Sequence, residues 1–175
     1  ITEPVRSPMI IRDLLTHTSG LSYSINFQSH VDDAYRKIFQ ISDPTKALVS
    51  DEKVDLEEFT KRIASLPLEF NPGDQWLYSV SIDICARLIE VISGKSIEDY
   101  FQENIFDPLG MEDTGFFVKE ENLKNLAACY FRDENKKLHV HDPGAKESRY
   151  AKPREFNGGG SGLISTSFDY FKFLQ

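Results

Sequence analysis

The stretch EFNPGDQWLYSVSIDICARLIEVISGKS, residues 69–96, sets the fold of this chain. Within residues 71–74 a proline that fixes its own φ precedes a glycine that accepts positive φ, so the segment predicts a turn. Apolar side chains over residues 81–93 cover more than one narrow stripe, which predicts a helix buried on most of its sides and ended by Gly94. Between turn and helix lies Tyr78-Ser79-Val80, which is either ordinary packing or one piece of an active site.

Length and composition indicate a single globular domain. A chain of 175 residues is long enough for one well-buried core and short for two. With 40% hydrophobic and 27% charged residues, the composition is typical of folded proteins. The net charge of −8 argues against a nucleic-acid partner, because its 20 basic residues are scattered and outnumbered by acidic ones.

The sequence assigns no compartment. No apolar run approaches the roughly 20 residues that span a bilayer, and the first residues, ITEPVRSP, lack the features of a signal peptide. The two cysteines, Cys85 and Cys129, are too few for a disulfide framework, and Cys85 lies in an apolar helical run where it is expected to pack as a small hydrophobe.

The rest of the chain predicts more helices and one hairpin. Helices are expected from Ser7-Pro8 to about Thr16, within residues 28–48, over residues 55–66 behind an Asp55/Glu58 capping box, over residues 96–107 until Pro108 stops it, and after a cap at Ser165 or Thr166. Residues 126–131 and 137–140 predict two strands, followed by an irregular polar loop over residues 141–157. The expected fold is mainly α with a small β hairpin.

Tyr78 has two interpretations on the residues alone. A tyrosine at the entry to a helix usually packs as a buried ring with a satisfied hydroxyl group. A catalytic tyrosine would accept a proton, but the ordinary pKa of a tyrosine hydroxyl is about 10. Only nearby positive charge, such as a lysine, makes it a base near neutral pH, and the stretch around Tyr78 contains none.

The glycine-rich segment that follows Asn157 does not match a nucleotide-binding motif. The spacing of Gly158, Gly159, Gly160 and Gly162 fits neither a P-loop nor a dinucleotide fingerprint. It predicts a tight turn and a close approach of the backbone to a neighbour or ligand. Ser161 is not a nucleophile-elbow serine, because the GxSxG pattern fails at Leu163.

Three other polar motifs carry weaker signals. His139, His141 and Asp142 resemble part of a metal site but lack a second ligand pair, which favours an exposed strand end. His17 has no acidic partner in sequence and is expected to order its loop by hydrogen bonding. Ser50-Asp51-Glu52-Lys53 places a serine one helical turn from a lysine, as nucleophile activation requires. No apolar residues surround that lysine, so we interpret the motif as chance.

A resemblance to a known family rests on three segments. They are IIRDLLTHTSGL (residues 10–21), LPLEFNPGDQWLYSVSIDICARLIEVISGKSIEDYFQENIFDPLGMEDTGF (66–116) and NGGGSGLISTSFDYFKFL (157–174). In order and spacing they resemble the serine β-lactamase and penicillin-binding protein superfamily, in particular its class C-like branch of β-lactamases, D-aminopeptidases and carboxylesterases. The segments cover more than half of the chain.

The resemblance implies roles for six residues. In that family the turn before the helix carries Tyr-Ser-Asn or Tyr-Ala-Asn, whose tyrosine lies beside the nucleophilic serine and takes part in proton transfer. Tyr78 matches this tyrosine and is the predicted catalytic residue. Val80 replaces the asparagine and has no group that could hydrogen-bond a substrate amide, which is similar to the esterase-like members. The predicted substrate-binding residues are Ser79, Val80, Gly158, Gly159 and Gly160.

The resemblance also implies that these residues are part of a longer enzyme. The family's nucleophile motif SxxK precedes the first segment, and its KTG or HxG strand follows the last. Residues 1–175 are therefore expected to be one domain, the helical middle portion of a serine hydrolase that forms an acyl-enzyme on a small ester, amide or β-lactam. On its own it would be inactive. No metal or organic cofactor is implied, and a bacterial enzyme of this kind would be periplasmic or cytoplasmic. The alternative is a non-catalytic binding module with the same fold.

Overall fold

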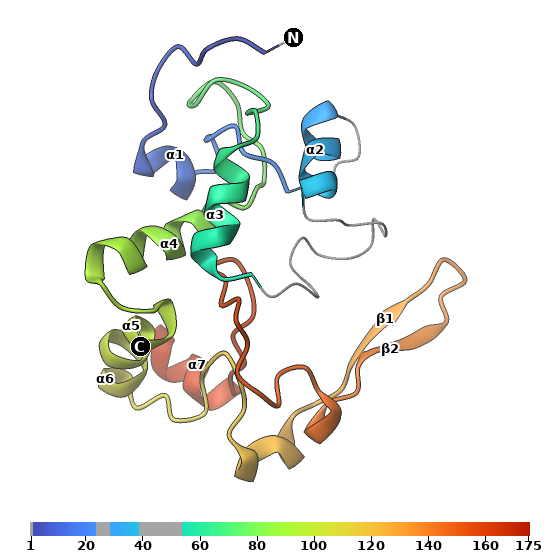
Figure 1. Cartoon of the computed structure of the whole chain (residues 1–175). Helices are drawn as coiled ribbons and strands as arrows, with labels where there is room; N and C mark the ends of the chain where they lie inside the picture. The colour runs from blue at the N-terminus through green and yellow to red at the C-terminus, as the bar shows by residue number, and fades with distance from the viewer. Residues whose placement is uncertain (1, 24–28, 39–53) are drawn as a thin grey trace. The chain divides into compact units, whose positions relative to one another are not determined.

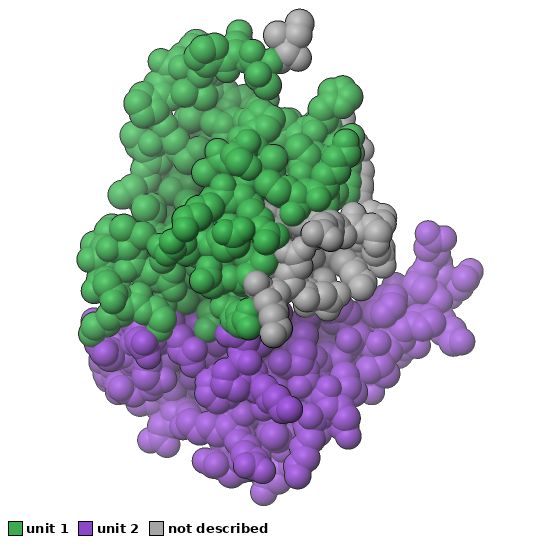
Figure 2. Space-filling model, viewed as in Figure 1, with its two compact units in different colours: residues 1–97, 155–161 green, residues 98–154, 162–175 purple. Residues whose placement is uncertain are grey.

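The computed structural model describes residues 2–23, 29–38 and 54–175 (Figure 1). Its described residues are mainly helical, with one two-stranded antiparallel sheet, as the sequence predicts. The chain forms two compact units, residues 1–97 with 155–161 and residues 98–154 with 162–175, which Figure 2 colours separately. A compact unit need not fold independently, so the expectation of one domain stays a prediction.

The first unit packs its helices around a common apolar core. Its described helices are α1 (Ile11–Leu15), α2 (His30–Ile38), α3 (Leu56–Ala64) and α4 (Ser81–Ser93). Both α1 and α3 pack against α4. The buried side chains between them are Leu14, Leu21, Tyr35, Val54, Phe59, Ile63 and Val80. Fully burying one such aliphatic or aromatic side chain contributes about 1.5–3 kcal/mol, so this cluster is the main source of stability in the unit.

Local signals set two helix ends in this unit as predicted. The Asp55 carboxylate accepts the backbone N–H of Glu58 at 2.8 Å, so Asp55 is the N-cap of α3. Gly94 follows α4 with a φ of 70°, the left-handed conformation of a glycine C-cap.

Two predictions for this unit were wrong. Helix α1 begins at Ile11 rather than near Ser7, because the Asp13 carboxylate accepts the N–H of Ile10 and fixes the start there. Helix α4 is not buried on most sides, since Val91 and Ile92 are 63% and 77% exposed and the fully buried positions lie in its first half.

Part of the helix predicted within residues 28–48 is α2. Residues 39–53 lie outside the described part of the chain.

The second unit contains shorter elements. They are α5 (Ile97–Phe101, beginning at the boundary of the first unit), the π-helical turn η1 (Gln102–Phe106), α6 (Asp107–Leu109), the 3₁₀ turns η2 (Glu120–Asn125) and η3 (Ala145–Glu147), the strands β1 (Cys129–Arg132) and β2 (Leu138–Asp142), and α7 (Ser167–Leu174). Pro108 does not stop the helix as predicted. It lies in the first turn of α6, where its missing N–H is tolerated, and the helix ends at Gly110 with a φ of 64°.

The predicted hairpin is confirmed. Strands β1 and β2 pair antiparallel with Tyr130 opposite Val140 and Arg132 opposite Leu138 (Figure 1). Within the connecting loop, Asp133 donates its N–H to the carbonyl of Lys137 at 3.0 Å, and Lys136 has a φ of 62°. The strands begin and end within a few residues of the predicted bounds.

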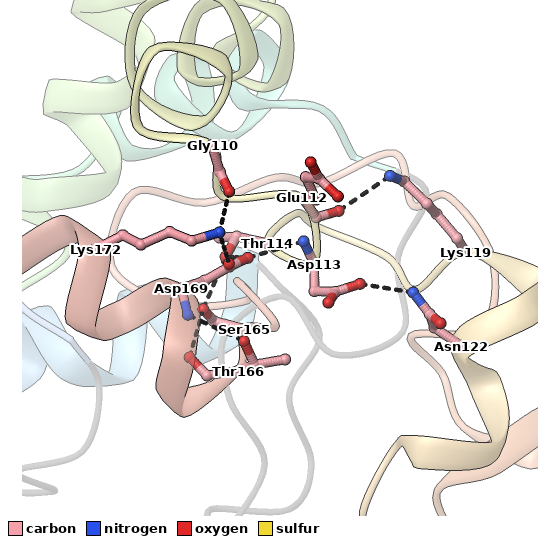
Figure 3. Close-up of polar contacts among 10 residues, drawn as sticks. All are labelled: Gly110, Glu112, Asp113, Thr114, Lys119, Asn122, Ser165, Thr166, Asp169 and Lys172. Atoms are coloured by element: carbon pink, nitrogen blue, oxygen red, sulfur yellow. Dashed lines mark hydrogen bonds and ion pairs between the residues drawn. The ribbon is translucent and has the colours of Figure 1, made fainter.

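A buried carboxylate anchors the N-terminus of α7 (Figure 3). Thr166 caps the helix by accepting the N–H of Asp169 at 3.1 Å, as one of the two predicted caps. Asp169 is 2% exposed and accepts the N–H of Asp113 at 2.8 Å, the Thr114 hydroxyl at 3.0 Å and the Lys172 ammonium at 3.1 Å. Burial alone would raise the pKa of Asp169, but these hydrogen bonds lower it on balance.

We expect Asp169→Ala to lower the free energy of unfolding by about 2 kcal/mol or more, because it leaves the donors around the carboxylate without their acceptor. Since the folded-state pKa of Asp169 is lowered, this stabilisation is present above about pH 4 and should shrink as the pH falls through the folded-state value. Urea unfolding at several pH values measures both effects.

The matched control for this variant is Asp113→Ala. The exposed side chain of Asp113 contacts Asn122, while its backbone N–H, which bonds Asp169, is retained. This control should change the free energy of unfolding by less than about 0.5 kcal/mol. Equal effects of the two substitutions would contradict the anchoring role of Asp169.

Candidate functional site

Tyr78 lies on a segment that is held at both ends by backbone hydrogen bonds. The turn before it forms as predicted. The Asp74 N–H donates to the backbone carbonyl of Asn71 at 3.1 Å, and Gly73 has a φ of 89°. The N–H of Leu77 donates to the carbonyl oxygen of His17 at 2.9 Å, and the N–H of Val80 donates to the carbonyl oxygen of Ser22 at 3.2 Å. Segment 77–80 therefore lies against residues 17–22 at the N-terminus of α4.

The Tyr78 side chain packs among aromatic rings and remains 46% exposed. Its ring centroid is 4.9 Å from the His17 ring and 5.5 Å from the Tyr23 ring. The Trp76 ring lies 6.3 Å from His17 in an edge arrangement. Tyr78 is therefore packed on more than one side and still reaches solvent, as a residue that meets a substrate must.

A cavity of about 400 Å³ adjoins the same segment. Trp76 and Leu77 line one part of it, and Ser29, Asp32 and Glu69 contribute polar atoms. The segment that carries Tyr78 thus borders a hollow with both apolar and acidic lining.

Ser79 belongs to a buried chain of hydroxyl groups. Its backbone N–H donates to Nδ1 of His17 at 3.3 Å, and its Oγ lies 2.7 Å from Oγ of Ser81. Oγ of Ser81 lies 2.8 Å from Oγ of Ser19. All three serines are buried. The prediction that His17 orders its loop by hydrogen bonding is confirmed, whereas the substrate-binding role of Ser79 stays a prediction.

Val80 points into the protein. Its side chain is 1% exposed and belongs to the core cluster with Leu14 and Phe59. Its observed contribution is packing in this core, and its predicted role toward a substrate stays a prediction.

The glycine-rich segment approaches α4 closely, as predicted. The N–H of Gly160 donates to Oδ1 of Asp83 at 3.0 Å. A Cβ atom on Gly159 would overlap the carbonyl oxygen of Ile82, and one on Gly158 would overlap the Asp83 carboxylate. Residue 159 needs glycine because the backbone in the first turn of α4 occupies the space of a side chain, whereas a Cβ atom on Gly160 would lie 3.2 Å from the Asp83 carboxylate. Their substrate-binding role stays a prediction.

Asp83 and Tyr23 are two titratable groups of this region that the sequence did not single out. Burial raises the pKa of Asp83, and the N–H groups of Gly160 and Gly159 lower it by a smaller amount. Burial, followed by electrostatic interaction with Asp83 and then with Tyr78, raises the pKa of Tyr23. A carboxylate inside an otherwise apolar helix pattern was the signal in the sequence that could have identified Asp83.

The remaining motifs have other partners or lie outside the described residues. His139 pairs with Asp133 at 2.8 Å, and Asp142 accepts the N–H groups of Gly144 and Arg149. Across residues 2–23, 29–38 and 54–175, no three His, Cys, Asp or Glu side chains form a group that could hold a metal ion. The serine and lysine of the Ser50–Lys53 motif lie outside the described residues.

Two further features concern the described part of the chain. Cys85 and Cys129 are free thiols. Among the helices of the described residues, none is long and apolar enough to cross a membrane.

The raised pKa of Asp83 predicts the pH dependence of stability. Between its ordinary value of 3.8 and its higher folded-state value, the folded state holds more protons than the unfolded state. The contribution of Asp83 to the free energy of unfolding therefore falls as the pH rises through this window. Asp83→Asn keeps the acceptor for Gly160 but cannot ionise, so its stability relative to the wild type should increase as the pH rises from about 4 to 7. Urea unfolding across this range tests the expectation, and a difference that does not vary with pH would contradict it.

Comparison with known proteins supports the same fold and family. The family model described as Beta-lactamase matches residues 1–175. An uncharacterized protein of Mycobacterium tuberculosis is 32% identical over 174 residues, which cover 99% of this chain and 40% of that protein. The lovastatin esterase of Penicillium rubens is 28% identical over 183 residues, which cover 100% of this chain and 41% of the esterase.

A solved structure has a similar fold. EstCE1, described as a hydrolase with promiscuous acyltransferase activity, matches with a TM-score of 0.76 and 23% identity over 97% of this chain and 45% of that chain. At this identity the likeness shows the fold alone. The chain spans about 40% of the length of its curated relatives, whose names include esterases and acyltransferases. Because the family model extends over all 175 residues, this chain belongs to the beta-lactamase family.

Proposed function

We propose that this chain is the helical, tyrosine-bearing portion of a longer serine hydrolase that cleaves small esters, or transfers their acyl groups, through an acyl-enzyme. The observation that carries the proposal is the placement of Tyr78, packed between His17 and Tyr23 but 46% exposed at the N-terminus of α4. Relatives named as esterases and acyltransferases support the reaction class. The nucleophilic serine and its lysine are proposed to lie in parts of the protein outside these residues.

In the proposed reaction Tyr78 moves a proton. The serine hydroxyl attacks the ester carbonyl carbon while the Tyr78 oxygen, made basic by the nearby lysine cation, takes the hydroxyl proton. The tetrahedral intermediate then collapses, the ester C–O bond breaks, and the proton passes from Tyr78 to the departing alkoxide. Water or an acceptor alcohol removes the acyl group by the same steps in reverse. A partly exposed hydroxyl on a fixed ring suits this role, because it must reach both serine and leaving group.

Esters are favoured over β-lactams as substrates. The position that holds asparagine in the resembling enzymes is Val80, and its side chain lies in the core. It offers no amide to hydrogen-bond the amide group of a β-lactam. An ester lacks the amide N–H and loses less from this replacement.

The competing function is a binding module that keeps the fold without catalysis. The burial of both Ser79 and Val80 favours it, because two residues beside Tyr78 then present no side chain to a substrate. The cavity bordered by Trp76 would be the ligand site of such a module.

Tyr78→Phe in the full-length protein should lower kcat/KM for a p-nitrophenyl ester by a factor of about 100 or more, the scale of a lost acid–base group. Tyr130→Phe, at an exposed tyrosine of the hairpin, is the matched control and should leave the rate within about two-fold of the wild type. Unchanged hydrolysis in Tyr78→Phe would refute the catalytic role.

The same assay, run with nitrocefin as a second substrate, separates the candidate functions. We expect the full-length protein to hydrolyse the ester faster than nitrocefin and the 175-residue chain to hydrolyse neither. Activity in the short chain would place the nucleophile within it, at Ser50 or Ser79. Inactivity of both proteins would favour the binding module.

A further inference from the structure

His17 occupies a backbone conformation that most side chains avoid. Its φ is 54°, in the left-handed region, where histidine is among the few tolerated residues besides glycine. Backbone hydrogen bonds fix it there, since the His17 N–H donates to Leu14, the Thr18 N–H donates to Asp13, and the His17 carbonyl accepts from Leu77. The ring therefore leaves the backbone at a fixed point facing segment 77–80.

One nitrogen of the His17 ring is committed to this segment. Nδ1 accepts the N–H of Ser79 at 3.3 Å and also lies 3.3 Å from the Ser79 hydroxyl oxygen. A ring nitrogen that accepts a hydrogen bond carries no proton, so this contact requires the Nε2–H tautomer of His17. Because Ser79 is buried, its N–H needs a partner within the protein.

The same ring also supports the side chain of Tyr78. Its centroid lies 4.9 Å from the Tyr78 centroid, with the two planes tilted by 40°. The ring thus contacts the tyrosine side chain while its nitrogen holds the next peptide group. Both contacts act on the residue whose hydroxyl position determines proton transfer in the proposed mechanism.

We infer that His17 is a positioning residue that fixes the Tyr78 hydroxyl for proton transfer by accepting the backbone N–H of Ser79. The inference rests on the proposed function and goes beyond it, because it assigns a second functional residue. His17 acts through the peptide that follows Tyr78, whose N–H its ring accepts. The hydrogen bond has the greater effect, since the exposed ring of Tyr78 loses only one neighbour when the imidazole is removed, whereas the buried N–H loses its acceptor.

Two substitutions separate the acceptor from the ring. In His17→Asn, the amide oxygen occupies the place of Nδ1, since both are bonded to Cγ, and asparagine tolerates positive φ. In His17→Phe, the ring remains but a C–H group replaces Nδ1. Because phenylalanine is strained at positive φ, His17→Gly serves as a further variant that removes the acceptor without backbone strain. In the full-length protein we expect His17→Phe and His17→Gly to lower kcat for a p-nitrophenyl ester about ten-fold or more with KM changed less than about three-fold, and His17→Asn to stay within about three-fold of the wild type.

A merely structural role would lower all of these variants alike or change KM and kcat together. Equal activity of His17→Gly and His17→Asn, whether both retained or both lost, would therefore overturn the inference. Circular dichroism confirms that each variant is folded before kinetics are compared.

Two NMR measurements on the full-length protein do not depend on activity. Long-range ¹H–¹⁵N spectra should show the Nε2–H tautomer for His17. Hydrogen exchange at the Ser79 amide should be slow in the wild type and in His17→Asn, and about ten-fold or more faster in His17→Phe. A proton on Nδ1, or equal exchange in both variants, would overturn the inference even if the wild type has no esterase activity.

Esterase activity lost in Tyr78→Phe but unaffected in His17→Phe would overturn the positioning role while leaving the proposed function intact.

Discussion

Backbone hydrogen bonds between residues 17–22 and residues 73–80 hold the candidate site together. Gly73 donates to Thr18 at 2.8 Å, Leu77 to His17 at 2.9 Å and Val80 to Ser22 at 3.2 Å. The two segments are far apart in sequence, so each bond closes a long loop whose entropy the core beneath must offset. The burial of Leu14, Phe59 and Val80 supplies that stabilisation. Tyr78 has a defined position only when both the core and these bonds form.

A group of buried polar residues around Ser22 is linked by hydrogen bonds beside this core. The N–H of Ser22 donates to the Tyr35 hydroxyl at 3.2 Å, and the Ser22 hydroxyl donates to the buried Asp32 carboxylate. These contacts join α2 to the segment that faces Tyr78, and burial raises the pKa of the Tyr35 hydroxyl, so it stays protonated. A satisfied polar network permits few alternative packings, because any shift leaves a buried donor or acceptor unpaired. The surroundings of Tyr78 are therefore specified by polar contacts as well as by apolar packing.

Local rules predicted the ends of several elements but not their burial. The Asp55 cap, the Gly94 terminus and the hairpin turn each depend on a few neighbouring residues, and all are present. Pro108 was misjudged because the π-helical turn η1 precedes it and lets the helix continue. In α7 the apolar side chains of Phe168, Phe171 and Leu174 are exposed, while Asp169 is the buried residue. Periodicity shows that a face exists, but the neighbouring elements decide which face is covered.

The sequence by itself determined the helical class of the fold, the hairpin, the turn before α4 and the family resemblance that singled out Tyr78. Each of these follows from residues close together in the chain or from motifs in a fixed order. The tertiary structure alone brought His17 to Ser79 and Asp83 to Gly160, because these partners are 62 and 77 residues apart. It also decided that Val80 is a core residue while Tyr78 reaches solvent. Residues two positions apart differ in this way because the packing of α1 and α3 on α4 determines which side chains are enclosed.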